Sequence, residues 1–466
     1  MNPQSPSIIE ESRKEFFSRL MFLALPIMLQ NLLVSSVSFI DTMMIGTVGE
    51  HAIAAVGLGN QMFFLITLFF FGISSGAAIF VAQYWGAQDR DSMHKVMGIA
   101  LILSVGGALL SSIVSFAIPE VIMSIFTDDP TVVALGKEYL EVVAFSYPFT
   151  AVVMIYSISL RSTGDAKTPL NIAVVAMSIN VLLNYVLILG KWGFPRLEVR
   201  GAALATVIAR GVEMVLLLGI IYKKKHPVAA PLKHLFGFNR AMVKKYLITC
   251  TPVILNEVFW SVGMTAYKIA YSRMGMQVIA SVNVSESIQN LFFVVLMGIT
   301  NASAIMIGNR IGENNINLAK RYASRLSLIG FLVGAFLGAL LAVLAPLLSR
   351  PFNLSPAVAH MTTLSLISLG VLVPIKAFNM VLVVGVLRAG GDTRFSMFAE
   401  LSGVWLIGVP CAFLGALVLG MPIHHLYLFV GLEEAFKFVV GIIRIKSGKW
   451  LNRLTEDPPP LVESLA

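Results

Sequence analysis

The segment LRSTGDAK, residues 160–167, returns as LRAGGDTR at residues 387–394. Six positions before this segment also return, 226 positions later: Pro26, Gly49, Gly72, Gly86, Phe126 and Pro148 reappear as Pro252, Gly275, Gly298, Gly312, Phe352 and Pro374. Residues 1–224 are thus repeated as residues 227–450, and both copies are almost entirely apolar. Such a duplicated block of hydrophobic helices is how many secondary transporters are built, with the substrate path between the copies.

The composition is that of a membrane protein. Apolar residues make up 57% of the chain and charged residues only 13%, whereas soluble domains carry about 25% charged residues. The net charge of +9 does not indicate a nucleic-acid partner, because the basic residues lie at the ends of apolar runs. The two cysteines, Cys250 and Cys411, lie in apolar segments and predict no disulfide framework. We also expect no cleavable signal peptide.

Twelve apolar segments reach the roughly 20 residues needed to cross a bilayer. They lie at 18–46, 53–84, 95–119, 133–160, 168–190, 201–223, 243–272, 278–309, 320–346, 358–387, 395–419 and 423–446. The sequence therefore predicts an all-α polytopic membrane protein with two lobes of six helices. The N-terminal lobe would be 1–225, the cytoplasmic linker 226–242 and the C-terminal lobe 243–466.

The basic residues also predict an orientation. Most of the 34 Lys and Arg residues fall on one side if the N-terminus is cytoplasmic, with a dense group from Lys223 to Lys245. By the positive-inside rule, both termini are cytoplasmic, in the inner or plasma membrane. Six spans in each copy make both copies enter in the same direction, so a pseudo-two-fold axis along the membrane normal should relate them. We expect a monomer in the lipid bilayer.

Asp41 is the first polar residue in a span that needs an explanation. A carboxylate in mid-membrane costs about 2.5–3.5 kcal/mol on insertion scales, and no basic residue lies within a helical turn of Asp41. It must bind a proton, a cation or a partner from another helix, unless it reaches water at the helix end. Asn180 and Asn184 share one face of the fifth span, where interhelical hydrogen bonding is the alternative role.

Several longer segments carry a family resemblance. GISSGAAIFVAQYWGAQD (72–89) and GITNASAIMIGNRIGENN (298–315), with TPVILNEVFW (251–260) and the repeated LRxxGDxK/R loop, resemble the MATE family of multidrug and toxic compound extrusion transporters. The resemblance covers about residues 19–449. It implies two six-helix lobes in a V and export of bulky, often cationic compounds driven by inward flow of Na⁺ or H⁺.

The resemblance also implies site residues. In the family, the acid of the first helix works with polar residues of the fifth and sixth helices in a cation site. The motif match places Asp41, Asn180, Asn184 and Thr206 in that site, with Asp41 as a Na⁺ ligand. Some members carry Asp where this chain has Asn184, which puts a two-acid proton relay in doubt here.

The second lobe departs from the family pattern. One branch has an acid at the position of Glu257 and another in the tenth helix, where this chain has Lys376 and Asn379. Glu257 then either binds a proton or cationic substrate, or pairs with Lys376 as an internal ion pair. Glu400 and Lys268 are further candidates for such a network, and Glu286 is an alternative cavity carboxylate.

No phosphate-cradling GxxxxGK[ST] loop and no metal-spaced His/Cys cluster occurs in the sequence. These absences argue against an ATP-driven pump and predict an antiporter without a cofactor, powered by Na⁺ or H⁺. Its partners would be small hydrophobic or cationic molecules. The alternatives are a lipid-linked saccharide flippase of a related branch, which usually has more spans and an arginine-rich cavity, and an intramembrane enzyme, for which no paired acids are seen.

Overall fold

The computed structural model describes residues 12–352 and 354–455, which form helices and loops without a strand. The first half contains α1 (Arg13–Gly46), α2 (Glu50–Gly86), α3 (Arg90–Ala117), α4 (Pro119–Ser124), α5 (Pro130–Val143), α6 (Ser146–Ser162), α7 (Lys167–Leu189) and α8 (Glu198–Lys223). A short helix, α9 (Leu232–Leu235), lies in the connection. The second half contains α10 (Arg240–Ser272), α11 (Met276–Gly312), α12 (Ile316–Leu348), η1 (Arg350–Phe352), α13 (Pro356–Met380), η2 (Val381–Arg388), α14 (Thr393–Ser402), η3 (Gly403–Gly408), α15 (Val409–Phe413), η4 (Leu414–Val418), α16 (Ile423–Val430) and α17 (Leu432–Ser447).

The number of spans is close to the predicted twelve. Within the described residues, ten helices are long and apolar enough to cross a membrane, and α5 with α6, bent by 52°, makes an eleventh. The segment predicted at 423–446 is divided at Gly431 into α16 and α17. It also carries Glu433, Glu434 and Lys437. The break and the charges explain why this segment does not match the other spans in length and apolarity.

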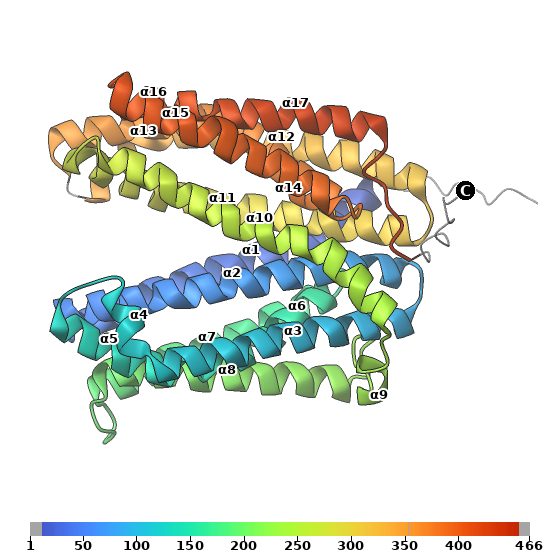
Figure 1. Cartoon of the computed structure of the whole chain (residues 1–466), viewed down its shortest axis with the longest axis horizontal. Coiled ribbons are helices and arrows are strands. Elements are labelled where there is room, and N and C mark those ends of the chain that lie inside the picture. The colour runs from blue at the N-terminus through green and yellow to red at the C-terminus, as the bar shows by residue number, and fades with distance from the viewer. Residues whose placement is uncertain (1–11, 353, 456–466) are drawn as a thin grey trace, which may run out of the picture.

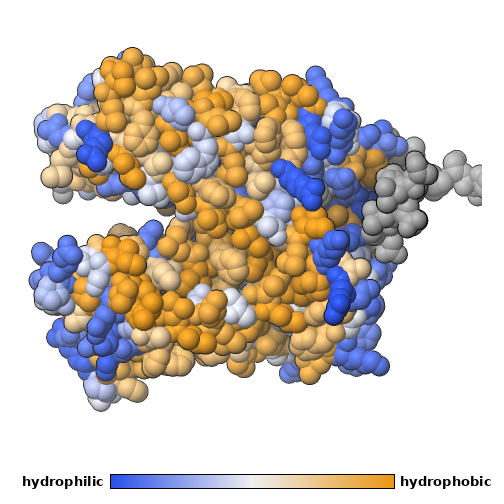
Figure 2. Space-filling model, viewed as in Figure 1, coloured by the Kyte–Doolittle hydropathy of each residue, from blue (hydrophilic) through white to orange (hydrophobic). Residues whose placement is uncertain are grey.

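The helices form two lobes separated by a cleft (Figure 1). Helices of the first half lie below and those of the second half above, and the lobes meet at the end that carries α9. We call this the linker end and the opposite end the open end. Figure 2 shows the cleft opening at the left, with apolar residues across the middle and hydrophilic residues gathered at both ends. This distribution fits a molecule that spans a bilayer.

The duplication is visible in the local structure of both halves. Asp89 accepts a hydrogen bond from the backbone of Ser92 (3.0 Å) and caps α3, and Asn315 accepts one from Leu318 (3.2 Å) and caps α12. Such caps satisfy backbone donors that a helix start leaves free. Each LRxxGD loop turns at a glycine with positive φ, 98° at Gly164 and 75° at Gly391, a conformation that side chains disfavour.

The two lobes meet through contacts that repeat about a pseudo-two-fold axis. Gly72 of α2 lies against Ile254 of α10, and its counterpart Gly298 of α11 lies against Met28 of α1, which is the counterpart of Ile254. Reciprocal contacts of this kind are what a two-fold axis produces. The halves are therefore related by rotation about an axis along the helices and not by inversion, as predicted from the even number of spans.

The first helix of each half passes from one lobe to the other. α10 runs diagonally across Figure 1, from the lower lobe at the linker end to the upper lobe at the open end. Near its start Tyr246 packs on Phe80 of α2, and near its end Tyr267 joins the core of the upper lobe. α1 does the reverse, since Phe16 packs on Tyr322 of α12. The lobes thus interlock at the linker end.

Prolines mark irregular places in equivalent spans. Pro26 and Pro252 lie inside α1 and α10. Pro148 lies in the first turn of α6, next to the bend from α5, and Pro374 lies inside α13, which continues as the π-helical segment η2. A proline removes one backbone hydrogen bond and crowds the preceding turn. The same residue thus accompanies a bend in one half and a π-helical segment in the other.

Candidate functional site

Asp41 lies near the end of α1, towards the open end of the molecule, and Asn184 of α7 is its direct partner. Asn184 Nδ2 donates to Asp41 Oδ1 at 2.6 Å and to Asn180 Oδ1 at 3.3 Å. Both asparagines are buried, with 1% and 7% of their surfaces exposed, and Asp41 is half-buried. The structure therefore brings together three of the four residues that the sequence placed in one site.

One oxygen beside this carboxylate has no partner. Asn184 Oδ1 is buried and accepts no hydrogen bond from any residue that the structure describes. Buried polar atoms are nearly always paired, so an orphan acceptor calls for a ligand that supplies positive charge or a donor. In the described part of the chain, no three His, Cys, Asp or Glu side chains gather as a metal site. A cation here would be held by one carboxylate and neutral oxygens, the ligands that hard cations prefer.

Two residues of α8, Thr206 and Arg210, differ in how they relate to Asp41. The Thr206 hydroxyl donates to the carbonyl of Ala202 in its own helix at 3.1 Å. Arg210, one turn further, is close enough to interact electrostatically with Asp41 and forms an ion pair with Glu213 at 2.7 Å. Sequence reasoning missed Arg210 as a neighbour of Asp41. Its position four residues after Thr206, on the same helix face, was the available signal.

The predicted residues of the second lobe do not form one cluster. Glu257 pairs with Arg388 of η2 at 2.8 Å, and not with Lys376. Lys376 instead lies over the ring of Phe293, 4.8 Å from its centre. The ion pair between Glu257 and Lys376 is therefore not found. Arg388 was overlooked because it belongs to the repeated LRxxGD loop and lies outside the apolar core of its span.

The other two predicted acids have separate lysine partners. Glu286 of α11 pairs with Lys268 of α10 at 2.9 Å, and both side chains are exposed, 37% and 57% respectively. Glu400 of α14 lies 3.4 Å from Lys437 of α17, whose side chain is 4% exposed. The Glu286 side chain is the more exposed of the two acids, since only 16% of the Glu400 side chain is exposed.

Lys437 belongs to a buried network that sequence reasoning did not assemble. It also lies 2.9 Å from Glu434 Oε1 and 3.8 Å from Glu433 Oε1. Tyr267 donates to Glu433 at 2.5 Å, and Asn379 donates to Glu434 at 2.7 Å. The signal was present in the spacing, since two acids three and four residues before a lysine share a helix face. These hydrogen bonds and charges offset the desolvation of each group.

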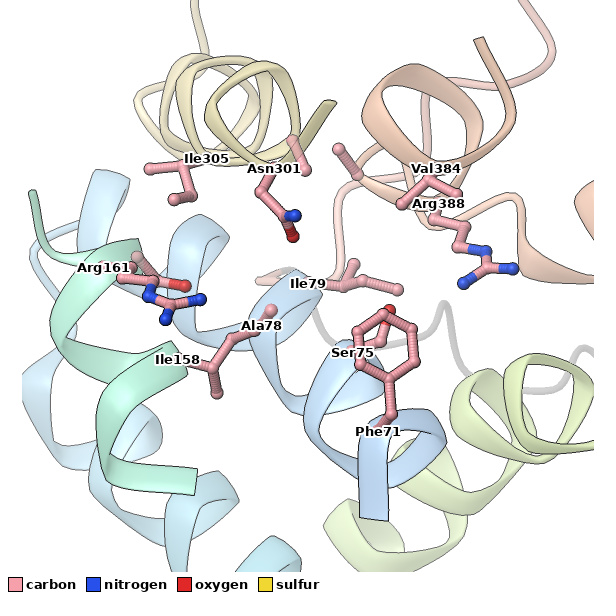
Figure 3. Close-up of a pocket in the computed structure, with 13 residues that line it drawn as sticks. Phe71, Ser75, Ala78, Ile79, Ile158, Arg161, Asn301, Ile305, Val384 and Arg388 are labelled. Atoms are coloured by element: carbon pink, nitrogen blue, oxygen red, sulfur yellow. The ribbon is translucent and has the colours of Figure 1, made fainter. Parts of the chain in front are cut away.

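A narrow pocket lies between the lobes, towards the linker end. Its polar side chains are those of Ser75 of α2, Arg161 and Ser162 of α6, Asn301 of α11 and Arg388 of η2. Figure 3 shows Arg161 and Arg388 on opposite sides of the pocket, Arg161 on a helix of one lobe and Arg388 on a helix of the other. No residue of this pocket was predicted from the sequence as a site residue.

The model of the MatE family matches residues 26–186 and again residues 252–414. The chain belongs to the MatE family. The two matches begin at Pro26 and at its repeat partner Pro252, so the family pattern follows the internal duplication. The resemblance that the sequence motifs indicated is thereby confirmed.

Relatives from several bacteria cover almost the whole chain. The probable multidrug resistance protein NorM of Thermotoga maritima is 24% identical over 96% of this chain and 94% of its own length. The uncharacterized transporter YisQ of Bacillus subtilis is 25% identical over 89% and 90%. The multidrug resistance protein MdtK of Yersinia pseudotuberculosis is 24% identical over 93% and 95%.

Solved structures share the fold. A MOP superfamily transporter from Pyrococcus furiosus matches with a TM-score of 0.84 at 20% identity, covering 92% of this chain and 96% of that one. A multidrug resistance MATE family transporter described as outward-facing matches with the same score, identity and coverage. At this identity the likeness supports the two-lobe architecture and leaves the chemistry of the site to this chain's own residues.

Proposed function

We propose that this MatE protein is a secondary active multidrug exporter that exchanges small hydrophobic or cationic compounds for Na⁺ or H⁺. Membership of the family and the relatives named multidrug resistance proteins support this function. The same names favour it over a lipid-linked saccharide flippase. In this proposal the protein is an antiporter and not an enzyme, and works as a monomer without a cofactor.

The observation that carries the proposal is the polar group around Asp41. Asn184 holds the carboxylate at 2.6 Å and leaves its own Oδ1 buried and unpaired. We infer that the coupling ion binds between Asp41, Asn180 and Asn184, with the hydroxyl of Thr206 as a further neutral ligand. Arg210, which is electrostatically coupled to Asp41, opposes cation binding and keeps the affinity low enough for release.

Alternating access requires that the ion and the drug prefer different states. With both termini in the cytoplasm of the plasma membrane or inner membrane, the open end faces outward, and Asp41 takes its ion from outside. Ion binding then disfavours the drug-loaded outward state and resets the protein inward. One charge crossing 100 mV supplies about 2.3 kcal/mol, enough for a drug gradient of roughly one to two decades.

In the second lobe, Glu286 is the carboxylate best placed to attract a cationic drug, because 37% of its side chain is exposed. Lys268 neutralises it between cycles. We assign Glu257, Lys376 and Glu400 to the support of the lobe, because the two acids are paired with Arg388 and Lys437. If the second lobe takes part in coupling, a change in its shape would alter the ion pairs of Glu257 with Arg388 and of Glu400 with Lys437.

The decisive experiment is dye efflux from proteoliposomes under an imposed Na⁺ gradient and, separately, an imposed pH gradient. We expect Asp41→Asn and Asn184→Leu each to lower ion-driven efflux by about tenfold or more, because an interaction with a charged group contributes about 1.5–3 kcal/mol. Ser178→Ala is the matched control on α7, since Ser178 is exposed and donates to the carbonyl of Val174 in its own helix. Unchanged efflux in Asp41→Asn under both gradients would refute the proposal.

A further inference from the structure

The interlobe pocket lies on the pseudo-two-fold axis. Its walls include residue pairs that are repeat partners: Ala78 with Ala304, Ile79 with Ile305, and Arg161 with Arg388. α2 and α6 supply one side, and α11 and η2 supply the other. The two arginines on opposite walls in Figure 3 are thus equivalent positions in the two halves.

The two arginines differ in charge compensation. Arg388 is 3% exposed and pairs with Glu257 at 2.8 Å. Arg161 has a neutral partner instead, because its Nη2 donates to Gln30 Oε1 at 2.5 Å. The repeat partner of Glu257 is Asn31, so the first half has no acid at that place. Across residues 12–352 and 354–455, no carboxylate lies within ion-pair distance of Arg161.

Two donors at the wall of the pocket also lack acceptors. Arg161 Nε and Ser162 Oγ are buried, and neither has a hydrogen-bond partner among the described protein atoms. A buried donor without an acceptor costs about 1–3 kcal/mol, and more when it carries charge. Water would satisfy these hydrogen bonds, but it would leave the charge of the half-buried Arg161 side chain without a counterion.

The size of the pocket restricts what can fill it. It offers about 30 Å³ of free space, where a single water needs at least about 10–15 Å³. Ala78, Ile79, Ile158 and Ile305 make the rest of its wall apolar. A weakly hydrated monatomic anion fits this volume and the mixed lining.

We propose that the interlobe pocket binds one halide ion, chloride in the cell, on Arg161 Nε and Ser162 Oγ, and that this ion holds the two lobes together at the linker end. The walls that enclose the ion come from both lobes, so they separate when the linker end opens. The ion therefore binds the present state more tightly than a state open at the linker end, and it shifts the population towards the present state. This inference does not depend on the drug or on the coupling cation.

The first test is a bromide soak or co-crystal of the full-length protein, read by anomalous scattering. The expected result is one peak beside Arg161 and Ser162, within hydrogen-bond distance of both donors. A map without that peak at saturating bromide would overturn the proposal. A peak beside Arg388 instead would show that the charge argument is wrong, because that arginine is already paired.

The second test measures thermal unfolding and amide exchange of detergent-solubilised protein while bromide replaces gluconate at constant Na⁺ and ionic strength. We expect a saturable rise of roughly 2–4 °C in the unfolding midpoint and slower amide exchange at the linker ends of α2 and α11.

Three variants test where the ion binds. Asn31→Glu should abolish the bromide response without loss of folding, since it supplies Arg161 with a carboxylate like the one that Arg388 has. Ser162→Ala should weaken the response, and Arg240→Gln, at an exposed position, should not alter it.

The most direct variant, Arg161→Gln, removes the proposed ligand but could also prevent folding. The variants Asn31→Glu and Ser162→Ala test the proposal without removing Arg161. An unchanged bromide response in Asn31→Glu would place the ion elsewhere. A bromide peak beside Arg161 with no change in amide exchange at the linker end would refute the coupling of the ion to lobe closure.

Discussion

Charged residues inside the spans differ in how much water their side chains can reach. The pair of Glu257 and Arg388 has 13% and 4% of its side chains exposed, while the pair of Glu286 and Lys268 has 37% and 57%. Removing one partner of a buried pair leaves an uncompensated charge in a low-dielectric interior, whereas an exposed partner is rehydrated. The two pairs should therefore respond very differently to the same type of substitution.

We expect Glu257→Gln to destabilise the protein by about 3–5 kcal/mol, because it leaves Arg388 buried without a counterion. Glu286→Gln, the matched control in the same lobe, should cost at most about 1 kcal/mol. Thermal unfolding in detergent measures both. The double substitution Glu257→Gln with Arg388→Met should recover most of the loss, and equal losses in the two single variants would contradict this interpretation of the pair.

At the scale of elements, the connection between the halves is attached to the loops at the linker end. His226 lies 3.8 Å from Asp165 of the first LRxxGD loop, and its Nδ1 accepts a hydrogen bond from the backbone of Val228 at 3.4 Å. Partial burial, with a smaller contribution from Lys224, lowers the pKa of His226 below that of an exposed histidine, although Asp165 acts in the opposite direction. The neutral imidazole is the form that fits this connection.

This shift predicts a pH-dependent connection. Because the pKa of His226 is lower in the folded protein, its stabilising contribution is complete above the pKa of an unfolded histidine, about 6.5, and is lost as the pH falls through the folded value. We expect faster amide exchange in residues 226–236 below about pH 6. His226→Gln should remove this dependence, and an identical pH profile in that variant would rule out His226 as its origin.

At the scale of the whole molecule, the lobes close the linker end through glycines. A Cβ on Gly86 would overlap the carbonyl oxygen of Asn309, and one on the repeat partner Gly312 would overlap that of Gln83. Gln83 further ties the C-terminal segment to this junction, since it donates to the carbonyl of Ala389 at 2.9 Å and accepts from the backbone of Leu454 at 2.7 Å. The junction is tight enough that one added methyl group should part the lobes.

We expect Gly86→Ala and Gly312→Ala to weaken the junction by similar amounts, about 1–3 kcal/mol each, because overpacking forces backbone shifts. Amide exchange at the linker ends of α2 and α11 should rise in both variants. Gly106→Ala is the control, since nothing lies within 4 Å of its Cβ position. A large effect in one variant and none in the other would contradict the pseudo-two-fold relation.

The sequence alone determined the class of the molecule, its two equal halves and their parallel relation. The reason is that hydrophobicity sets the number of spans, and an even number per copy sets the direction in which the second copy enters the membrane. It also placed Asp41, Asn180 and Asn184 together, since two of them share a helix face and the family motif supplied the third.

Only the tertiary structure decided which charges meet. Glu257 pairs with Arg388 and not with Lys376, Asp41 lies near Arg210, and Arg161 is left with Gln30. These partners come from different helices, so spacing along the chain carries no information about them. The sequence likewise did not predict that α1 and α10 cross from one lobe to the other. An apolar helix face can pack against the core of either lobe, and only the packing of the whole fold determines which core it contacts.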